Sequence, residues 1–121
     1  MTLRLSCFLI LSFLLSIPAQ AAVEKGPYLI YEGSNTSMTV IWQMSSTQNC
    51  NIEWGTSTSY GMGSANTSEY GSDHQHKYTI TGLNPGTKYY YNVNCAGSGS
   101  FRTAPASSAS NVKILAYGDT R

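Results

Sequence analysis

The chain has 121 residues, a formal net charge of +1 and only 11% charged residues. This weak charge excludes the basic surface by which proteins bind nucleic acid or anionic membranes. About 100 residues remain after an N-terminal targeting segment is set aside, which is enough for one small domain and leaves little margin for two.

The first 21 residues resemble a secretory signal peptide. Arg4 gives a positive start, residues 5–17 form an unbroken run of apolar and small residues, and residues 19–21 (Ala-Gln-Ala) form a small-x-small cleavage site. The run is shorter than the ~20 apolar residues of a transmembrane helix and meets Pro18 rather than a charged stop. We therefore expect cleavage, no membrane contact afterwards, and a protein secreted to an extracellular or periplasmic compartment. A retained membrane anchor is the alternative.

Alternation of apolar and polar residues predicts about seven short strands between residues 22 and 104. Met38, Val40 and Trp42, for example, fall on one face of a strand. No mature segment has a helical period of 3.6 residues. A tight turn is predicted at residues 97–99. The expected strands cover residues 28–32, 37–43, 50–54, 76–80, 88–94 and 100–103, with one short, weak strand in the loop-rich stretch 56–73.

Half-apolar sheets need a second sheet to cover them, because one alone buries too little surface to offset the entropy of ordering its chain. The sequence therefore predicts an all-β sandwich of the fibronectin type III or immunoglobulin-like kind over residues 22–104. Its bulkiest core residues are expected to be Trp42, Trp54, Leu83 and Tyr89. The Tyr89 hydroxyl fits a corner position that caps the preceding turn.

Two cysteines, Cys50 and Cys95, remain in the mature chain. Export to an oxidising compartment favours a disulfide between them. In such sandwiches the third and sixth strands are antiparallel neighbours, which would set the two cysteines side by side on one face. Two buried reduced cysteines are the alternative. Two cysteines alone cannot form a four-ligand zinc site.

Two further residue pairs invite a functional interpretation. His74 and His76 share a face if their segment is extended, but no third metal ligand lies at suitable spacing, so a structural role is favoured. Asn35 and Asn66 each begin a glycosylation acceptor pattern in a predicted loop. In a bacterial source this pattern would have no meaning.

The composition changes after residue 104. Residues 105–111 form a linker of low charge, and a strand-like apolar run then ends at Gly118-Asp119. The seven earlier strands already complete a sandwich, so we interpret residues 112–121 as the truncated start of a second, α/β domain. Asp119 follows a strand, where α/β folds place their ligands, and a carboxylate suits a hard cation. A simple turn residue is the alternative.

The ordered motifs resemble one family, the N-terminal domain of purple acid phosphatases. They cover nearly the whole mature chain, and the ordered set followed by a strand and Gly-Asp is fairly specific. The matching segments are residues 25–28 (Lys-Gly-Pro-Tyr), 38–42, 52–57 (Ile-Glu-Trp-Gly-Thr-Ser), 76–83, the Leu-x-Pro-Gly-Thr-x-Tyr corner at 83–89, 101–105 (Phe-Arg-Thr-Ala-Pro) and 116–119 (Ala-Tyr-Gly-Asp).

The resemblance implies that a calcineurin-like metallophosphoesterase domain follows, with Asp119 as the first ligand of a dinuclear metal centre of iron with iron, zinc or manganese. It implies a secreted acid phosphatase acting on phosphate monoesters, in which this chain is the non-catalytic N-terminal domain and its partner is its own catalytic domain. The later metal-binding motifs have no counterpart here, so we expect this polypeptide alone to be inactive.

Residues 118–121 (Gly-Asp-Thr-Arg) look more like the broader bacterial-type metallophosphoesterases, because Arg121 replaces the small residue usual in purple enzymes. A guanidinium matches phosphate oxygens, so Arg121 is a candidate substrate contact, with a solvated arginine as the alternative. From a different functional class, the alternative for the whole chain is a stand-alone extracellular binding or adhesion module, since such sandwiches host many functions.

Overall fold

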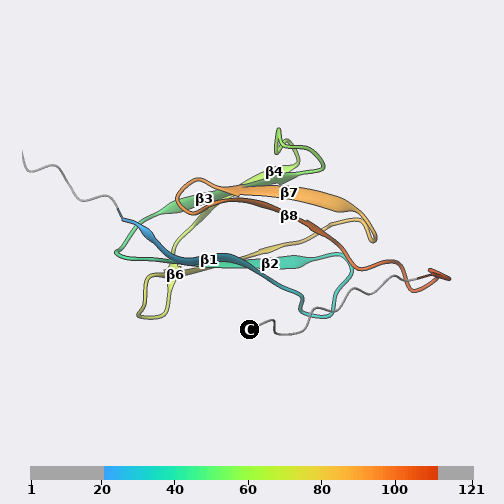
Figure 1. Cartoon of the computed structure of the whole chain (residues 1–121), viewed down its shortest axis with the longest axis horizontal. Coiled ribbons are helices and arrows are strands. Elements are labelled where there is room, and N and C mark those ends of the chain that lie inside the picture. Colours follow the sequence, from blue (N-terminus) through green and yellow to red (C-terminus); the bar gives the residue numbers. More distant parts are fainter. Residues whose placement is uncertain (1–20, 112–121) are drawn as a thin grey trace, which may run out of the picture.

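A computed structural model of the protein describes residues 21–111, and these form eight strands and no helix (Figure 1). The strands form two antiparallel four-stranded sheets in the orders β1-β2-β6-β5 and β4-β3-β7-β8, which lie one above the other in Figure 1. The prediction of an all-β sandwich is confirmed. The strands are β1 (Val23–Ile30), β2 (Met38–Met44), β3 (Cys50–Gly55), β4 (Gly63–Thr67), β5 (Glu69–Tyr70), β6 (Gln75–Ile80), β7 (Lys88–Val93) and β8 (Gly97–Arg102).

The core lies between the two sheets and follows the period of two in the sequence. Every second residue of β2 points inward and is buried, from Met38 to Met44, and Trp42 is fully buried. From the other sheet Tyr89, Tyr91 and Val93 of β7 meet them. Apolar surface removed from water in this layer is the main favourable term for folding.

Three of the four predicted bulky core residues are buried, namely Trp42, Leu83 and Tyr89. Trp54 is only partly buried, because it lies near the end of β3 and packs at the margin of the core against Tyr78, with ring centroids 5.5 Å apart.

The corner between β6 and β7 is held by two hydroxyl groups. The Tyr89 hydroxyl accepts the backbone N–H of Asn84 at 2.9 Å, which confirms the predicted capping role. Buried Thr103 donates to the Asn84 carbonyl at 2.6 Å and accepts the N–H of Thr87 at 2.9 Å. Both groups satisfy backbone atoms of a turn that would otherwise lack partners.

Several predicted boundaries are wrong. β1 begins at Val23, five residues early, and the stretch 56–73 contains two short strands instead of one. The turn expected at residues 97–99 lies at 94–96, where the Ala96 N–H bonds the Val93 carbonyl at 3.0 Å. Gly97 then opens β8 with a φ of +108°, a conformation that favours glycine. Turn-forming residues fill this whole segment, so composition alone did not fix the register.

Asn66 also departs from expectation, because it lies in β4 rather than in a loop. It pairs with Asn51 of β3, whose side-chain amide N–H donates to the side-chain oxygen Oδ1 of Asn66 at 3.0 Å. β4 consists of small and polar residues because it is the outermost strand of its sheet, where little side-chain burial is needed. Asn35 lies in a loop, as predicted.

Candidate functional site

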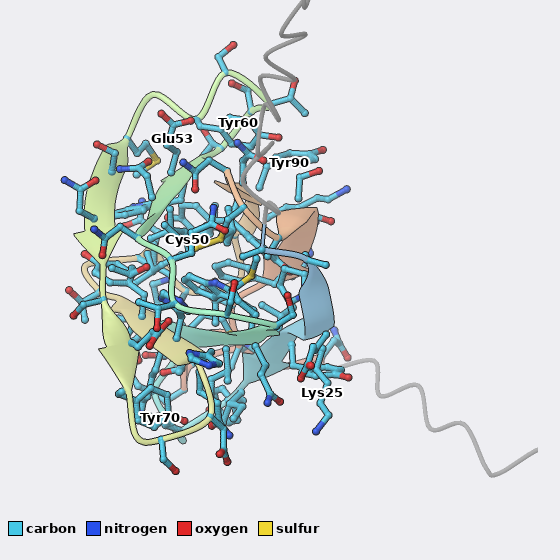
Figure 2. All side chains as sticks on the ribbon, turned by 90° about the vertical axis from the view of Figure 1, so that its left-hand side faces the viewer. Lys25, Cys50, Glu53, Tyr60, Tyr70 and Tyr90 are labelled. Carbon is cyan, nitrogen blue, oxygen red and sulfur yellow. A yellow bond between two sulfur atoms is a disulfide. The ribbon has the colours of Figure 1, made fainter. Side chains whose placement is uncertain are left out.

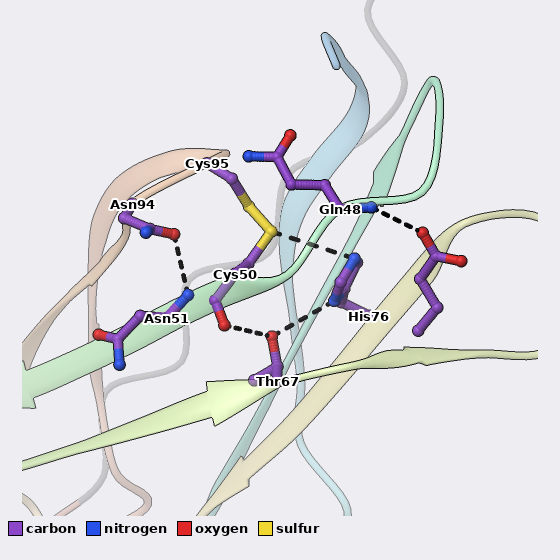
Figure 3. The surroundings of a disulfide bond; sticks show 8 residues. Gln48, Cys50, Asn51, Thr67, His76, Asn94 and Cys95 are labelled. Atoms are coloured by element: carbon purple, nitrogen blue, oxygen red, sulfur yellow. Dashed lines mark hydrogen bonds between the residues drawn. A yellow bond between two sulfur atoms is a disulfide. The ribbon is translucent and has the colours of Figure 1, made fainter. Parts of the chain in front are cut away.

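The predicted metal ligand Asp119 and the predicted substrate contact Arg121 lie outside the described residues, as do the strand-like run before them and nearly all of the proposed signal peptide. The described chemistry is therefore that of the sandwich itself. Within it, buried His76 lies beside the sulfur of Cys50 (Figure 3).

Cys50 and Cys95 form a disulfide, with Cα atoms 5.7 Å apart. The bond joins the start of β3 to the residue two positions beyond β7, because these strands pair antiparallel. Beside the bond, Asn94 accepts the Asn51 N–H at 2.9 Å (Figure 3). The disulfide therefore staples two neighbouring strands of one sheet and leaves no thiol in these two side chains for metal binding or nucleophilic attack.

His76 lies next to this disulfide and is fully buried. Its ring stacks on Trp42, the cross-strand neighbour in β2, with centroids 5.1 Å apart and an interplanar angle of 3°. Its Nδ1 lies 3.3 Å from the Thr67 hydroxyl, and its Nε2 lies 4.0 Å from the Cys50 sulfur (Figure 3). The ring thus fills the space between the sheets as a core residue.

The hydrogen bonds of Thr67 indicate which His76 nitrogen carries the proton. Thr67 donates its single hydroxyl hydrogen to the Cys50 carbonyl at 3.1 Å, so the same oxygen must accept from His76 Nδ1–H. In the neutral ring Nε2 is therefore unprotonated. A second proton on Nε2 would face a disulfide sulfur, which is a weak acceptor. Burial lowers the pKa of His76 below its usual range, and the opposing charge of Glu69 does not reverse this.

Glu69 connects the loop before β3 to the loop before β6. It accepts the Gln48 N–H at 3.0 Å, and His74 Nδ1 lies 3.2 Å from each of its carboxylate oxygens. Partial burial raises the pKa of this carboxyl, but the hydrogen bonds from His74 and Gln48 outweigh burial, so the pKa of Glu69 lies below its ordinary value.

His74 and His76 do not share a face, because the condition of an extended segment is not met. His74 has a φ of +52° and precedes β6, so the segment is not extended there. Its ring turns to Glu69, whereas the His76 ring enters the core. The favoured structural role fits both residues. The partners Thr67 and Glu69 had no signal in the sequence, because they come from other strands.

Within residues 21–111 no three His, Cys, Asp or Glu side chains lie close enough together to hold a metal ion. Of the two main surface hollows, the one of about 150 Å³ is smaller than the roughly 300 Å³ of small-molecule sites. The other, of about 420 Å³, has only small polar walls, whereas ligand sites are mostly apolar. The first is lined by Lys25, Tyr28, Ile41, Trp42, Gln43 and Gln75, and the second by Asn49, Asn66, Thr67 and Ser68.

Comparison with known proteins decides the family. The model of the family described as "Purple acid Phosphatase, N-terminal domain" matches residues 25–113, which is more than half of the chain. The chain belongs to this family. The purple acid phosphatase N-terminal domain is part of a phosphatase, and purple acid phosphatases generally use a dinuclear metal centre. The described part of this domain lacks the donor set for such a centre, so we derive no chemical step within it.

The other comparisons add little to this assignment. None of the curated proteins compared with the chain is significantly similar to it. Among solved structures it is similar to the sensor domain of the anti-sigma factor RsgI4 in Pseudobacteroides cellulosolvens, with 18% identity and a TM-score of 0.48 over 78% of this chain and 97% of that one. In the described residues no helix is long and apolar enough to cross a membrane.

Proposed function

We propose that this chain is the non-catalytic N-terminal domain of a secreted, metal-dependent phosphatase that hydrolyses phosphate monoesters. The observation that carries the proposal is the family match, which runs from residue 25 through the sandwich and the linker to residue 113. The proposed organisation is a signal peptide (1–21), the sandwich domain (22–104), a linker (105–111) and the start of a metallophosphoesterase domain (112–121). The described strands, which end at Arg102, fit these bounds.

The division of labour follows from the chemistry of the described residues. Two metal ions that bind a phosphate ester need several carboxylate and imidazole ligands around one cavity. In the sandwich His76 instead packs in the core against Trp42 and Thr67. His74 contacts Glu69, which connects two loops. We therefore assign hydrolysis to the residues downstream, with Asp119 as one ligand and Arg121 as a phosphate contact, and infer that residues 1–121 alone are inactive.

The test is to determine the reading frame beyond Arg121, express the complete protein, and assay hydrolysis of p-nitrophenyl phosphate with and without a chelator. We expect turnover that the chelator abolishes, and none from residues 22–111. A complete protein without phosphatase activity would contradict the proposal.

A substitution at Asp119 tests its role separately. Changes in groups that only support a metal ligand cost 10–100-fold, so Asp119→Asn should lower turnover by at least about a hundredfold. It should also lower the bound metal measured by elemental analysis. Asp73→Asn, in an exposed loop of the sandwich, is the matched control and should change neither. Full metal content in Asp119→Asn would exclude Asp119 as a ligand.

A further inference from the structure

At the end of β1 four consecutive large residues are exposed. Tyr28, Leu29, Ile30 and Tyr31 have exposed fractions of 57%, 39%, 41% and 54%, and we call them the β1 apolar edge. They are four of the seven large hydrophobic residues that are exposed within residues 21–111. Single exposed apolar residues are common, but contiguous ones mark an interaction site.

The β1 apolar edge is apolar on both faces. Tyr28 pairs with Ile41 and Ile30 with Thr39, so these two side chains point away from the core, whereas Leu29 pairs with core residue Val40 and points to the core side. The hollow of about 150 Å³ adjoins Tyr28 on this strand. A partner that covers the edge therefore meets apolar side chains above and below the strand.

The backbone of this strand also lacks a second neighbour. β1 is the outermost strand of its sheet and is bonded only to β2. Its first half is irregular, with register shifts up to Tyr28 and a charge at Lys25, and both features discourage pairing with another strand. From Tyr28 to Ile30 the register is regular, and the next charge is Glu32, which lies 3.3 Å from Lys77. A regular, apolar and open edge of this kind is an aggregation hazard unless it is covered.

The outer face of the other sheet differs in character. Glu53 and Tyr90 lie on that face (Figure 2), where Glu53 pairs with Asn92 and the Lys88 amine lies 4.8 Å from the centre of the Tyr90 ring. Polar and charged groups of this kind suit water. Figure 2 also shows Lys25 of β1 and Tyr70 of β5 on opposite sides of the molecule, as expected for the two edges of one sheet.

The chain leaves the sandwich beside the β1 apolar edge. The loop that follows the edge bonds the outgoing linker, because Asn35 donates its side-chain amide to the Pro105 carbonyl at 3.3 Å. Figure 1 shows this loop and the exit from β8 at the same end of the molecule. Residues 106–109 form a turn closed by the Ala109 N–H and the Ala106 carbonyl at 3.0 Å. Even fully extended, residues 106–111 reach only about 20 Å, so whatever follows them starts close to this edge.

We infer that the β1 apolar edge is the docking surface for the domain that follows in the same chain, through an apolar segment of that domain. This inference rests on the proposed function, which supplies the second domain. A short linker holds its two ends at an effective concentration in the millimolar range, which favours this occupant over a second copy of the protein. Docking buries the four side chains and covers the open edge.

Hydroxyl-radical footprinting of the complete protein, read by mass spectrometry, tests this inference with natural probes. Tyr28 and Tyr31 report on the edge, and Tyr70, which is 45% exposed on the opposite edge, is the matched control of the same chemistry. Because the centre of an interface excludes water, we expect Tyr28 and Tyr31 to be oxidised about tenfold more slowly than Tyr70. Equal or faster oxidation would overturn the inference, and so would a reading frame that ends at Arg121.

A substitution gives an independent readout. In the complete protein, Ile30→Lys should weaken docking and raise the rate of proteinase K cleavage within residues 105–111 about tenfold. Met62→Lys, at a residue that is 51% exposed but lies in the loop before β4, should leave that rate unchanged. Equal cleavage of the two variants would contradict the inference.

Three other outcomes would distinguish a wrong occupant, a wrong docking surface and a wrong proposed function. Protection of Tyr28 that disappears on dilution, together with dissociating dimers in sedimentation velocity, would identify a second copy and overturn the assigned occupant. Phosphate-ester hydrolysis with exposed Tyr28 and Tyr31 would contradict the docking surface alone. Protected tyrosines in an inactive complete protein would contradict the phosphatase proposal alone.

Discussion

At residue 89 a side-chain hydroxyl caps the turn between β6 and β7, one of the two hydroxyl groups that hold this corner. The Tyr89 ring is fully buried, and its oxygen is the acceptor for the Asn84 N–H. Tyr89→Phe keeps the ring but leaves that N–H without its partner, so the free energy of unfolding should fall by about 1–3 kcal/mol. Urea denaturation measures the change. Tyr90→Phe, on the outer face, is the control and should change stability little. Equal stability of both variants would show that the hydroxyl does not hold the corner.

The space above Gly99 of β8 is filled by the ring of Tyr91, which comes from the neighbouring strand β7. Gly99 pairs with Tyr91, and a Cβ at Gly99 would lie 2.5 Å from the Tyr91 hydroxyl oxygen. Replacing glycine stabilises by about 0.4–1 kcal/mol where space is free. Overpacking costs about 1–3 kcal/mol and should win here, because Tyr91 is only 4% exposed and has little room to move. Gly99→Ala should therefore lower the urea midpoint.

Gly61→Ala is the matched control for this substitution. A Cβ at Gly61 meets nothing within 4 Å, so its midpoint should stay the same or rise. If Gly99→Ala were as stable as Gly61→Ala, the ring of Tyr91 would have moved at no cost, and the assigned close packing would be wrong.

At the scale of elements, the β2–β6 pair contains a histidine in the core, and this makes stability depend on pH. The pKa of His76 is lowered in the folded state, so the unfolded chain binds more protons as the pH falls below about 6.5. Stability should thus fall on acidification, by up to about 1.4 kcal/mol per pH unit for one proton. Glu69, whose pKa is also lowered, should add a further loss below pH ~4.5.

His76→Phe tests this origin, because it keeps a ring against Trp42 and removes the titrating group. The melting temperature of this variant should depend less on pH between about 6.5 and 5 than that of the wild type. Above pH ~7 the two curves should run parallel, since His76 is neutral there in both states. An unchanged slope in the variant would assign the acid sensitivity to other groups.

At the scale of the whole molecule, the disulfide restricts the unfolded chain. It closes a loop with a sequence separation of 45 residues. The double substitution Cys50→Ser and Cys95→Ser should lower the free energy of unfolding by about 2–4 kcal/mol. Thiol titration of the unfolded, unreduced mature protein should find no free thiol. Two free thiols would show that the bond is absent. In that case neither the serine substitutions nor reduction should change the free energy of unfolding much.

The arrangement of the whole domain separates its surfaces by character. One sheet presents a polar outer face, whereas the β1 apolar edge lies beside the exit of the chain. A domain that supports a second one needs this asymmetry, because the covered surface must be apolar and the remaining surface must stay in water. The footprinting experiment on Tyr28 and Tyr31 addresses this asymmetry in the complete protein.

The sequence by itself determined the fold class and most of the core. The period of two in β2 and β7 places Trp42 and Tyr89 inward, and side chains alternate between faces whatever the neighbouring strands are. The hydrogen bond at the Tyr89 corner could also be predicted, because its two partners, Asn84 and Tyr89, lie within six residues of chain. The ordered motifs likewise indicated the family that the match to residues 25–113 shows.

Only the tertiary structure decided the contacts between distant strands. The stack of His76 on Trp42, the bond from Thr67 and the link from Glu69 to Gln48 each join segments that no local pattern relates. The turn at residues 94–96 depended on the register between β7 and β8, which polar and glycine-rich residues leave open. The exposure of the β1 apolar edge depended on which strand lies at the border of the sheet, and that is a property of the assembled sandwich because strand order arises only when the chain has folded.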